Sequence, residues 1–478
     1  MMRSNVALVL VAVTLLAVVA PGVASVGGAA ESPGSGVCAD TVRTQPDGLT
    51  VVSVQGMRFS DNESLQGKTP ARLVAFHPDG SIAWVHRSAE AFDVFWSYDV
   101  DPLPNGNLFV TATPPGETLV YELDPETGEA VWTETLPEHD THDADLLPNG
   151  NVVVANMRNY DDEADVNRDR VFVYNRTTDE VVWQWEFENY FDRAGGGNYT
   201  EDWTHVNDVD VVGEDRLLLS PRNFDQVLLL NRTTGEVVWQ LGGDERYNVL
   251  YEQHNPDYLV SDDGTATVLV ADSENDRVVE YARDGDGWTR TWTLGGGENG
   301  LFGGGESALS WPRDADRLPS GNTLVSDSRN SRVLEVTPSG DVVWEVYAPW
   351  LVYDAARVSA GEHGGPTIAD QNVGVDPSLE NASAPSAASL ERCAQAIRDH
   401  ENVAWNRANE TNETTDAHTD TAETTTAART STETGTTETT AEPSDSDGDL
   451  VEPASATPVG FTAVGAAVAL LVGWWRYG

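Results

Sequence analysis

Three histidines, His142, His205 and His254, lie in consecutive copies of a repeated unit, each near the start of its copy. Imidazole acts as a nucleophile, as a proton shuttle near neutral pH and as the commonest metal ligand. The copy with His205 also carries Asn207 and Arg222. A forked guanidinium suits the oxygens of a sulfate or phosphate group. The pattern therefore predicts a site in which histidines meet an oxyanion.

A short phrase ending in tryptophan defines the elements that must position these residues. Its six copies end at Trp84, Trp132, Trp183, Trp239, Trp292 and Trp344, which are 48, 51, 56, 53 and 52 residues apart. A period near fifty, with about four short strands in each unit, is typical of a β-propeller. We therefore expect an all-β fold of six blades, with the tryptophans packed between blades.

A second phrase opens the blades, and its clearest copies contain a Pro-Asn-Gly or Pro-Ser-Gly turn signal. Superimposing its copies places six polar residues at one position facing the central channel, just before the innermost strand: Tyr98, His142, Asn207, His254, Arg313 and Tyr353. His205 precedes Asn207 by two residues, which puts both on one face of an extended chain. The phrase is missing before Trp84 but follows Trp344, so the C-terminal strand is expected to close the ring within the first blade.

Arginines recur at the end of the second strand of several blades. For Arg158 and Arg329 we expect salt bridges between blades. For Arg222, in the same blade as His205 and Asn207, we expect contact with an anion near the channel axis.

The two ends of the chain differ in composition from its middle. We expect a signal peptide or anchor at 1–25, the propeller at 45–360, and an extension with a short helix at 361–408. A Thr/Ser/Glu-rich stretch at 409–457 is typical of a disordered stalk. The apolar segment 458–476 is expected to be a transmembrane helix or a surface-sorting tail of archaeal type. The propeller would then be membrane-anchored at the cell surface, outside the cell.

Charge indicates a habitat rather than a partner. The net charge is −50, and Lys68 is the only lysine. This composition is typical of a halophile, because concentrated salt screens the repulsion between carboxylates. It excludes nucleic acid as a partner, because no basic patch remains.

The cysteines and sequons fit an extracellular protein. Cys38 and Cys393 flank the propeller, so in an oxidising compartment a disulfide could fasten its two ends. Their spacing is not that of a zinc motif. Seven Asn-x-Ser/Thr sequons are candidate glycosylation sites: Asn62, Asn175, Asn198, Asn231, Asn381, Asn409 and Asn412.

Over roughly residues 45–360 the chain resembles the bacterial arylsulfate sulfotransferase family of six-bladed extracytoplasmic propellers. The resemblance rests on Thr141–Asp143, Trp203–Asn207, Ser220–Asn223 and Glu252–Asn255. It implies that one channel histidine accepts a sulfuryl group from an aryl sulfate and passes it to a phenol, without a nucleotide donor or another cofactor.

Matched motif by motif, the resemblance places His254 at the nucleophile. It places His142, His205, Asn207 and Arg222 at positions that bind or stabilise sulfate. From the residues themselves, His142 could act as the acid or base for the phenol. The remaining channel residues are expected to bind substrate, with the tyrosines at the aromatic ring: Tyr98, Tyr353 and Arg313.

Two other functions remain open from the sequence. His139 could join His142, His205 and His254 in a metal site, which would indicate a metal-dependent hydrolase. The propeller could also be a non-catalytic surface protein that binds a ligand or glycan, because the fold alone determines no function.

Overall fold

Tight turns join the first strand of a blade to the second, and their sequence explains their geometry. At Leu103–Gly106 and Leu147–Gly150 the glycine N–H donates to the leucine carbonyl at 2.9 and 2.8 Å, and the glycine φ is 89° and 80°. Glycine adopts this φ without strain, and the proline at the second position presets the turn. The phrase therefore reverses the chain, and an antiparallel strand follows.

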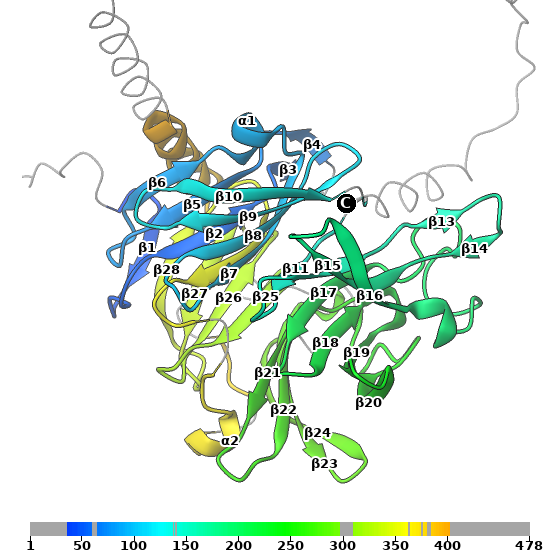
Figure 1. The fold of residues 1–478 in the computed structure, drawn as a ribbon. Coiled ribbons are helices and arrows are strands. Elements are labelled where there is room, and N and C mark those ends of the chain that lie inside the picture. The colour runs from blue at the N-terminus through cyan, green and yellow to red at the C-terminus, as the bar shows by residue number, and fades with distance from the viewer. Residues whose placement is uncertain are drawn as a thin grey trace, which may run out of the picture.

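The computed structural model describes residues 36–59, 65–136, 138, 141–296, 309–361, 364–373, 376–379 and 384–401. Within these residues the chain forms six antiparallel sheets of four or five strands and two short hairpins, and the predicted six-bladed all-β propeller is confirmed (Figure 1). In each blade the strands follow one another in chain order from the channel outward, except that β29 is the innermost strand of blade 1 and β1 the outermost strand of blade 6.

The strands of each blade are given from the channel outward. Blade 1 contains β29 (Val352–Arg357), β2 (Thr50–Val54), β5 (Arg72–Phe76) and β6 (Ile82–His86). Blade 2 contains β7 (Trp96–Pro102), β8 (Leu108–Thr113), β9 (Thr118–Asp124) and β10 (Glu129–Leu136). Blade 3 contains β11 (Ala144–Leu146), β12 (Val152–Asn156), β15 (Arg170–Asn175) and β16 (Glu180–Glu186). Blade 4 contains β17 (Val206–Val211), β18 (Arg216–Pro221), β19 (Gln226–Asn231) and β20 (Glu236–Gly242). Blade 5 contains β21 (His254–Val260), β22 (Ala266–Asp272), β23 (Arg277–Asp284) and β24 (Gly287–Gly295). Blade 6 contains β25 (Pro312–Arg317), β26 (Thr323–Asp327), β27 (Arg332–Val336), β28 (Val342–Tyr347) and, at its outer edge, β1 (Ala39–Val42).

Short elements lie between these strands. They are the hairpins β3 (Met57–Phe59) with β4 (Leu65–Lys68) and β13 (Tyr160–Asp161) with β14 (Val166–Asn167), the helices α1 (Ser88–Phe92) and α2 (Ile368–Gln371), and the 3₁₀ turns η1 (Phe187–Asn189), η2 (Arg222–Phe224) and η3 (Ser273–Asn275).

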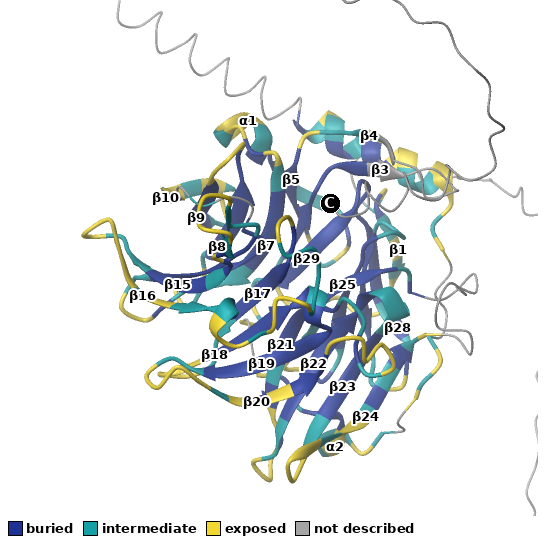
Figure 2. Ribbon diagram, turned by 90° about the vertical axis from the view of Figure 1, so that its right-hand side faces the viewer, coloured by how far each residue is buried: buried dark blue, intermediate teal, exposed yellow. Residues whose placement is uncertain are grey.

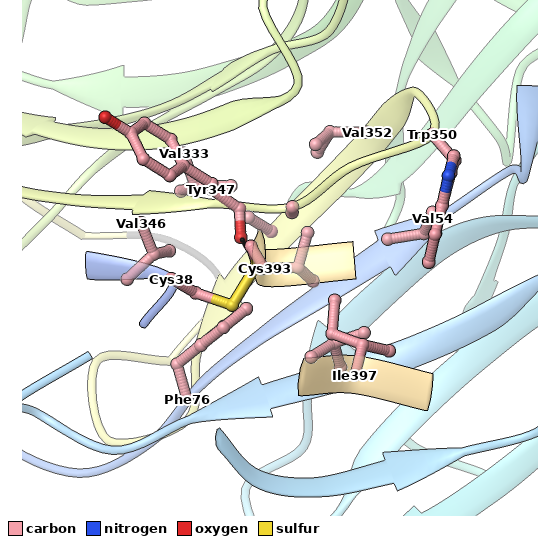
Figure 3. Close-up of a cluster of buried hydrophobic side chains, with 14 of the residues drawn as sticks. Cys38, Val54, Phe76, Val333, Val346, Tyr347, Trp350, Val352, Cys393 and Ile397 are labelled. Atoms are coloured by element: carbon pink, nitrogen blue, oxygen red, sulfur yellow. Dashed lines mark hydrogen bonds between the residues drawn. A yellow bond between two sulfur atoms is a disulfide. The ribbon is translucent and has the colours of Figure 1, made fainter. Parts of the chain in front are cut away.

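Both ends of the propeller supply a strand to a blade that the rest of the chain builds. β29 pairs with β2 and forms the innermost strand of blade 1, as the displaced opening phrase predicts. β1 pairs with β28 on the opposite edge of blade 6. Cys38, directly before β1, forms a disulfide with Cys393, which lies in a helix at 387–401. Figure 3 shows this bond beside Phe76 and Ile397, within one buried apolar cluster.

Three tryptophans of the repeat connect neighbouring blades through their indole N–H groups, as expected. The indole N–H of Trp84 in blade 1 donates to the carbonyl of Pro125 in blade 2. The indole of Trp292 in blade 5 donates to Pro338 in blade 6 at 3.0 Å. The indole of Trp344 in blade 6 donates to Pro78 in blade 1 at 3.1 Å, so the same contact also closes the ring.

Several predictions concern residues outside the described part of the chain: the segments 1–25, 409–457 and 458–476, the sequons at Asn62, Asn381, Asn409 and Asn412, and His139. In the part that the structure describes, no helix combines the length and apolar character needed to cross a membrane.

Candidate active site

The six predicted channel residues converge at the centre of the propeller, around Tyr353 of blade 1. Its ring centre lies 5.0 Å from that of Tyr98, 5.8 Å from that of His142 and 6.1 Å from that of His254. The guanidinium carbon of Arg313 lies 5.1 Å from the same ring, and the Tyr353 hydroxyl donates to the backbone carbonyl of Asn207 at 3.4 Å. All six side chains are at most 2% exposed. Most of the length of the innermost strands β7, β17, β21, β25 and β29 is dark blue in Figure 2, which marks buried residues.

The position of these residues differs in detail from the prediction. Except for His142, which precedes β11, they belong to the innermost strands and do not precede them. Most of these strands carry a bulge beside the channel residue; in β17, Val206 faces Pro221 whereas Val209 faces Leu219. A bulge inserts one extra residue and redirects the side chains beside it. Pairing therefore begins before the channel residue, which the sequence pattern does not reveal.

The residue two places before the channel residue is left-handed in four successive blades. The φ values are 43° for His205, 46° for Glu252, 54° for Trp311 and 71° for Leu351. His205 is therefore not on an extended chain with Asn207, and that expectation is wrong. A residue other than glycine is strained in the left-handed backbone conformation, and such strain is common at functional sites. Here it turns the chain sharply as it enters the channel.

A hydroxyl group determines which ring nitrogen of His254 carries the proton. Ser273, at the start of η3, donates its hydroxyl proton to the carbonyl of Pro312 at 2.7 Å. Its Oγ lies 2.8 Å from Nδ1 of His254 and must accept the hydrogen bond from Nδ1–H. The lone pair is therefore on Nε2, which makes no hydrogen bond within the described residues. Burial, followed by the charges of Arg313 and Arg222, holds the pKa of His254 well below its ordinary value.

His205 is oriented by a carboxylate. Its Nδ1 lies 2.9 and 2.8 Å from the two oxygens of Asp202, so Nδ1–H donates to this group and Nε2 carries the lone pair. Burial and then Arg222 lower the pKa of His205 to about 3. Arg158 of blade 3 binds the same carboxylate at 3.1 Å, which confirms its predicted salt bridge between blades. An imidazole held by a buried carboxylate in this way is arranged to act as a base.

His142 stacks against the ring of Tyr98, with 3.9 Å between ring centres, and meets His205 edge-on at 4.9 Å. Burial, followed by the neighbouring His205, keeps the pKa of His142 well below its ordinary value. Burial raises the pKa of both Tyr98 and Tyr353, so both phenols stay neutral. The centre of the channel thus holds three neutral imidazoles and two neutral phenols at neutral pH.

Positive charge comes from Arg313 and Arg222. Burial lowers the pKa of Arg313 to about 10, so its guanidinium stays charged at neutral pH, and it donates to the side chain of Gln55. Arg222, at the start of η2, lies 3.4 Å from a carboxylate oxygen of Glu252. Asn207 donates to the carbonyl of Gln253 at 2.9 Å. These groups give the site the polar and cationic contacts that an oxyanion requires.

An apolar cluster adjoins the histidines, which we call the aromatic wall: Trp96, Trp311, Met57 and Leu351. The ring centre of Trp311 lies 6.1 Å from that of His254. The guanidinium carbons of Arg313 and Arg329 lie 3.9 and 4.7 Å from the Trp311 ring. The wall could therefore bind a flat aromatic group beside the histidine, with cations close to it.

The sequence signals missed three supporting residues. The sequence assigned no role to Ser273, Asp202 or Trp311. Asp202 stands three residues before His205, and Trp311 stands two residues before Arg313. Within the described residues, the side chains close enough to share a metal ion are aspartates and not the histidines.

Comparison with solved structures finds distant propellers. A protein of unknown function from Bacteroides caccae has a TM-score of 0.43 and 13% identity, covering 65% of this chain and 98% of its own. An inactive virginiamycin B lyase variant from Staphylococcus aureus, solved with quinupristin, has a TM-score of 0.36 and 10% identity, covering 65% and 87%. Similarity at this level says nothing about chemistry. Among curated proteins, none matches the sequence.

Comparison with protein families gives a direct match. The family model described as arylsulfotransferase (ASST) matches residues 36–283, which is slightly more than half of the chain. The match covers blade 1 without its innermost strand β29, blades 2 to 4 and most of blade 5, and it includes all three channel histidines. The chain belongs to the arylsulfotransferase family.

Proposed function

We propose that this protein transfers a sulfuryl group from a phenolic sulfate ester to a phenolic acceptor through a sulfohistidine at His254. The observation that carries the proposal is the chain of hydrogen bonds from His254 through Ser273 to Pro312, which leaves the Nε2 lone pair available. The low pKa of His254 adds to this, because the imidazole stays neutral and nucleophilic at neutral pH.

In the first step, the Nε2 lone pair of His254 forms a bond to sulfur. The bond from sulfur to the aryl oxygen breaks, and its electron pair leaves with the phenolate. Negative charge spreads over the sulfuryl oxygens, and Arg222 and Arg313 offset it. Asn207 contributes its amide to the same group, and the aromatic wall holds the aryl ring.

In the second step, the acceptor phenol attacks sulfur. Its proton passes to Nε2 of His205, and the resulting imidazolium is stabilised by Asp202. The nitrogen–sulfur bond breaks, and its electrons return to His254. His205 then releases the proton to the departed phenolate or to solvent, so the enzyme is regenerated without a nucleotide donor or cofactor.

The setting of this activity is part of the proposal. The apolar N-terminal run and the tail at 458–476 favour a glycosylated, membrane-anchored protein with its propeller outside the cell. The single lysine and the net charge of −50 favour a halophilic archaeal source. A ligand-binding propeller without turnover is the competing function, and no contact in the site favours it over catalysis.

The proposal is tested by His254→Ala, with His86→Ala as the matched control. His86 is also buried, but it lies in blade 1 outside the channel and contacts the carbonyl of Gly128. We expect His254→Ala to lose release of a chromogenic phenol, whereas His86→Ala retains it. Intact-mass analysis after brief exposure to the donor should show one sulfuryl group on the wild type and none on His254→Ala. Turnover by His254→Ala would overturn the assignment.

A further inference from the structure

A layer of acidic side chains lies one residue beyond the catalytic layer. The residue that follows the channel residue is acidic in every blade except blade 5, where it is an amide: Asp99, Asp143, Asp208, Asn255, Asp314 and Asp354. A second layer follows two residues later: Asp101, Asp145, Asp210, Asp257 and Asp316. The proposed sulfuryl transfer uses none of them.

Most of these side chains line a partly open cavity of about 40 Å³ in the channel, and Asp143 and Asp145 lie outside its wall. Eight aspartates line it, and no lysine, arginine or histidine is among the described residues of its wall. It has room for an ion with water, because one water needs only ~10–15 Å³ on the same measure. Burying this many carboxyl groups together is unfavourable unless they are protonated or paired, and a bound cation is one way to pair them.

The carboxylates also have a structural role, which explains their repetition. Asp354 accepts the backbone N–H of Val100 in the next blade at 2.8 Å, and Asp257 accepts that of Arg317 at 3.1 Å. Each such bond joins the innermost strands of adjacent blades. Each of these hydrogen bonds occupies one carboxylate oxygen and leaves the negative charge of the aspartate in place. The hydrogen bonds therefore do not explain why the carboxylates crowd together.

The crowding is greatest around Asp143. Two groups of three carboxylates have ligand oxygens within 4.8 Å of one another, and Asp143 belongs to both. Their members are Asp99, Asp101 and Asp143 in one group, and Asp143, Asp208 and Asp210 in the other. Such a set of hard oxygen atoms, from three blades, matches the preference of Ca²⁺ for six to eight oxygens.

Asn255 supplies an independent observation that points to a ligand. It lines the cavity, is only 8% exposed, and donates its amide N–H to Asp99 at 3.4 Å. Its Oδ1 has no hydrogen-bond partner in the described part of the chain. Reversing the amide would place this oxygen against the Asp99 carboxylate, so the orientation is favoured by charge. A buried acceptor without a partner in the protein is satisfied by a bound cation or by a water.

We infer that the channel binds Ca²⁺ between the aspartates of blades 2, 3 and 4, with Asn255 facing the same cavity. The ion would fasten the innermost strands of three blades beneath the catalytic layer. It would also offset the negative field that the carboxylates exert on an incoming sulfate ester. The site does not depend on the proposed sulfuryl transfer.

The test is direct binding by the full-length protein. The protein is freed of metal with EDTA and exchanged into buffer of fixed ionic strength. It is then titrated calorimetrically with CaCl₂. The weakest calcium modules have a Kd of ~10⁻³ M, and the titration ends at roughly ten times that concentration. We expect at least one Ca²⁺ per chain and a higher Tm with Ca²⁺ than with EDTA. The absence of saturable binding to the wild type would overturn the inference, whatever the variants do.

Two matched variants locate the ion. Asp143→Asn should weaken Ca²⁺ binding at least about tenfold, because it removes a charge shared by both groups. Asp145→Asn is the control, because Asp145 holds the N–H of Val211 at 2.8 Å, as Asp143 holds that of Val209, but belongs to neither group. We expect Asp145→Asn to bind Ca²⁺ as the wild type does. Equal weakening in both variants would indicate a general charge effect and refute the site.

Discussion

Ser273→Ala should lower the sulfotransfer rate without removing any group that touches the substrate. The serine hydroxyl accepts the proton of Nδ1 and so keeps the lone pair of His254 on Nε2. Without it, Nδ1–H has no acceptor in a residue that is 1% exposed, and the opposite tautomer becomes favourable. Leaving a buried donor unpaired costs ~1–3 kcal/mol. At 1.36 kcal/mol for each tenfold change, kcat/KM should fall about 5- to 150-fold.

The assay is release of a chromogenic phenol in the presence of excess acceptor, with Ser328→Ala as the control. Ser328 holds the position in blade 6 that Ser273 holds in blade 5, directly after an aspartate. It is equally buried, and its hydroxyl makes no hydrogen bond in the described residues. We expect Ser328→Ala to keep its activity. If Ser273→Ala stays within about twofold of the wild type, while His254→Ala is inactive, the hydroxyl does not control the tautomer and the reasoning is refuted.

Two further predictions concern pH and stability. The pKa of His254 is lowered, so the imidazole stays neutral as the pH falls. We therefore expect kcat/KM to show no loss from histidine protonation between about pH 8 and pH 6. A tenfold fall in kcat/KM per pH unit that begins near pH 6.5 would contradict the assignment. Replacing Cys38 and Cys393 by alanine should lower the free energy of unfolding by about 2–5 kcal/mol, because the disulfide closes a very long loop. Denaturant titration measures this, and an unchanged midpoint would show that the bond adds nothing.

Periodicity was sufficient to predict the blades, because each repeat carries its own turn signal and its own tryptophan. The same alignment brought the correct side chains to the channel, since one residue in every repeat must occupy that position. Tyr98, His142 and Tyr353 are therefore found together although they come from different blades.

The local geometry of the site was not readable from the sequence. His205, Glu252, Trp311 and Leu351 share a left-handed backbone although none is glycine, so the surrounding structure overrides their local preference. The partner of His254 lies 19 residues away in a different turn, and only the bulged pairing of β21 with β22 brings it within reach. The alternation of apolar residues along the strands predicts neither the left-handed residues nor the hydrogen bond from His254 to Ser273.

The closure of blade 1 by β29 also determines when blade 1 can be completed during synthesis. β2 leaves the ribosome early, but its inner partner follows roughly 300 residues later, which at ~5–20 residues per second takes about 15–60 s. During that interval the inner edge of β2 has no native strand beside it, and Tyr353, the residue around which the catalytic side chains gather, has not yet been made. The inner edge of blade 1 is therefore the last part of the propeller to form, and a chain that stops before β29 retains five complete blades but lacks Tyr353 at the centre of the candidate site.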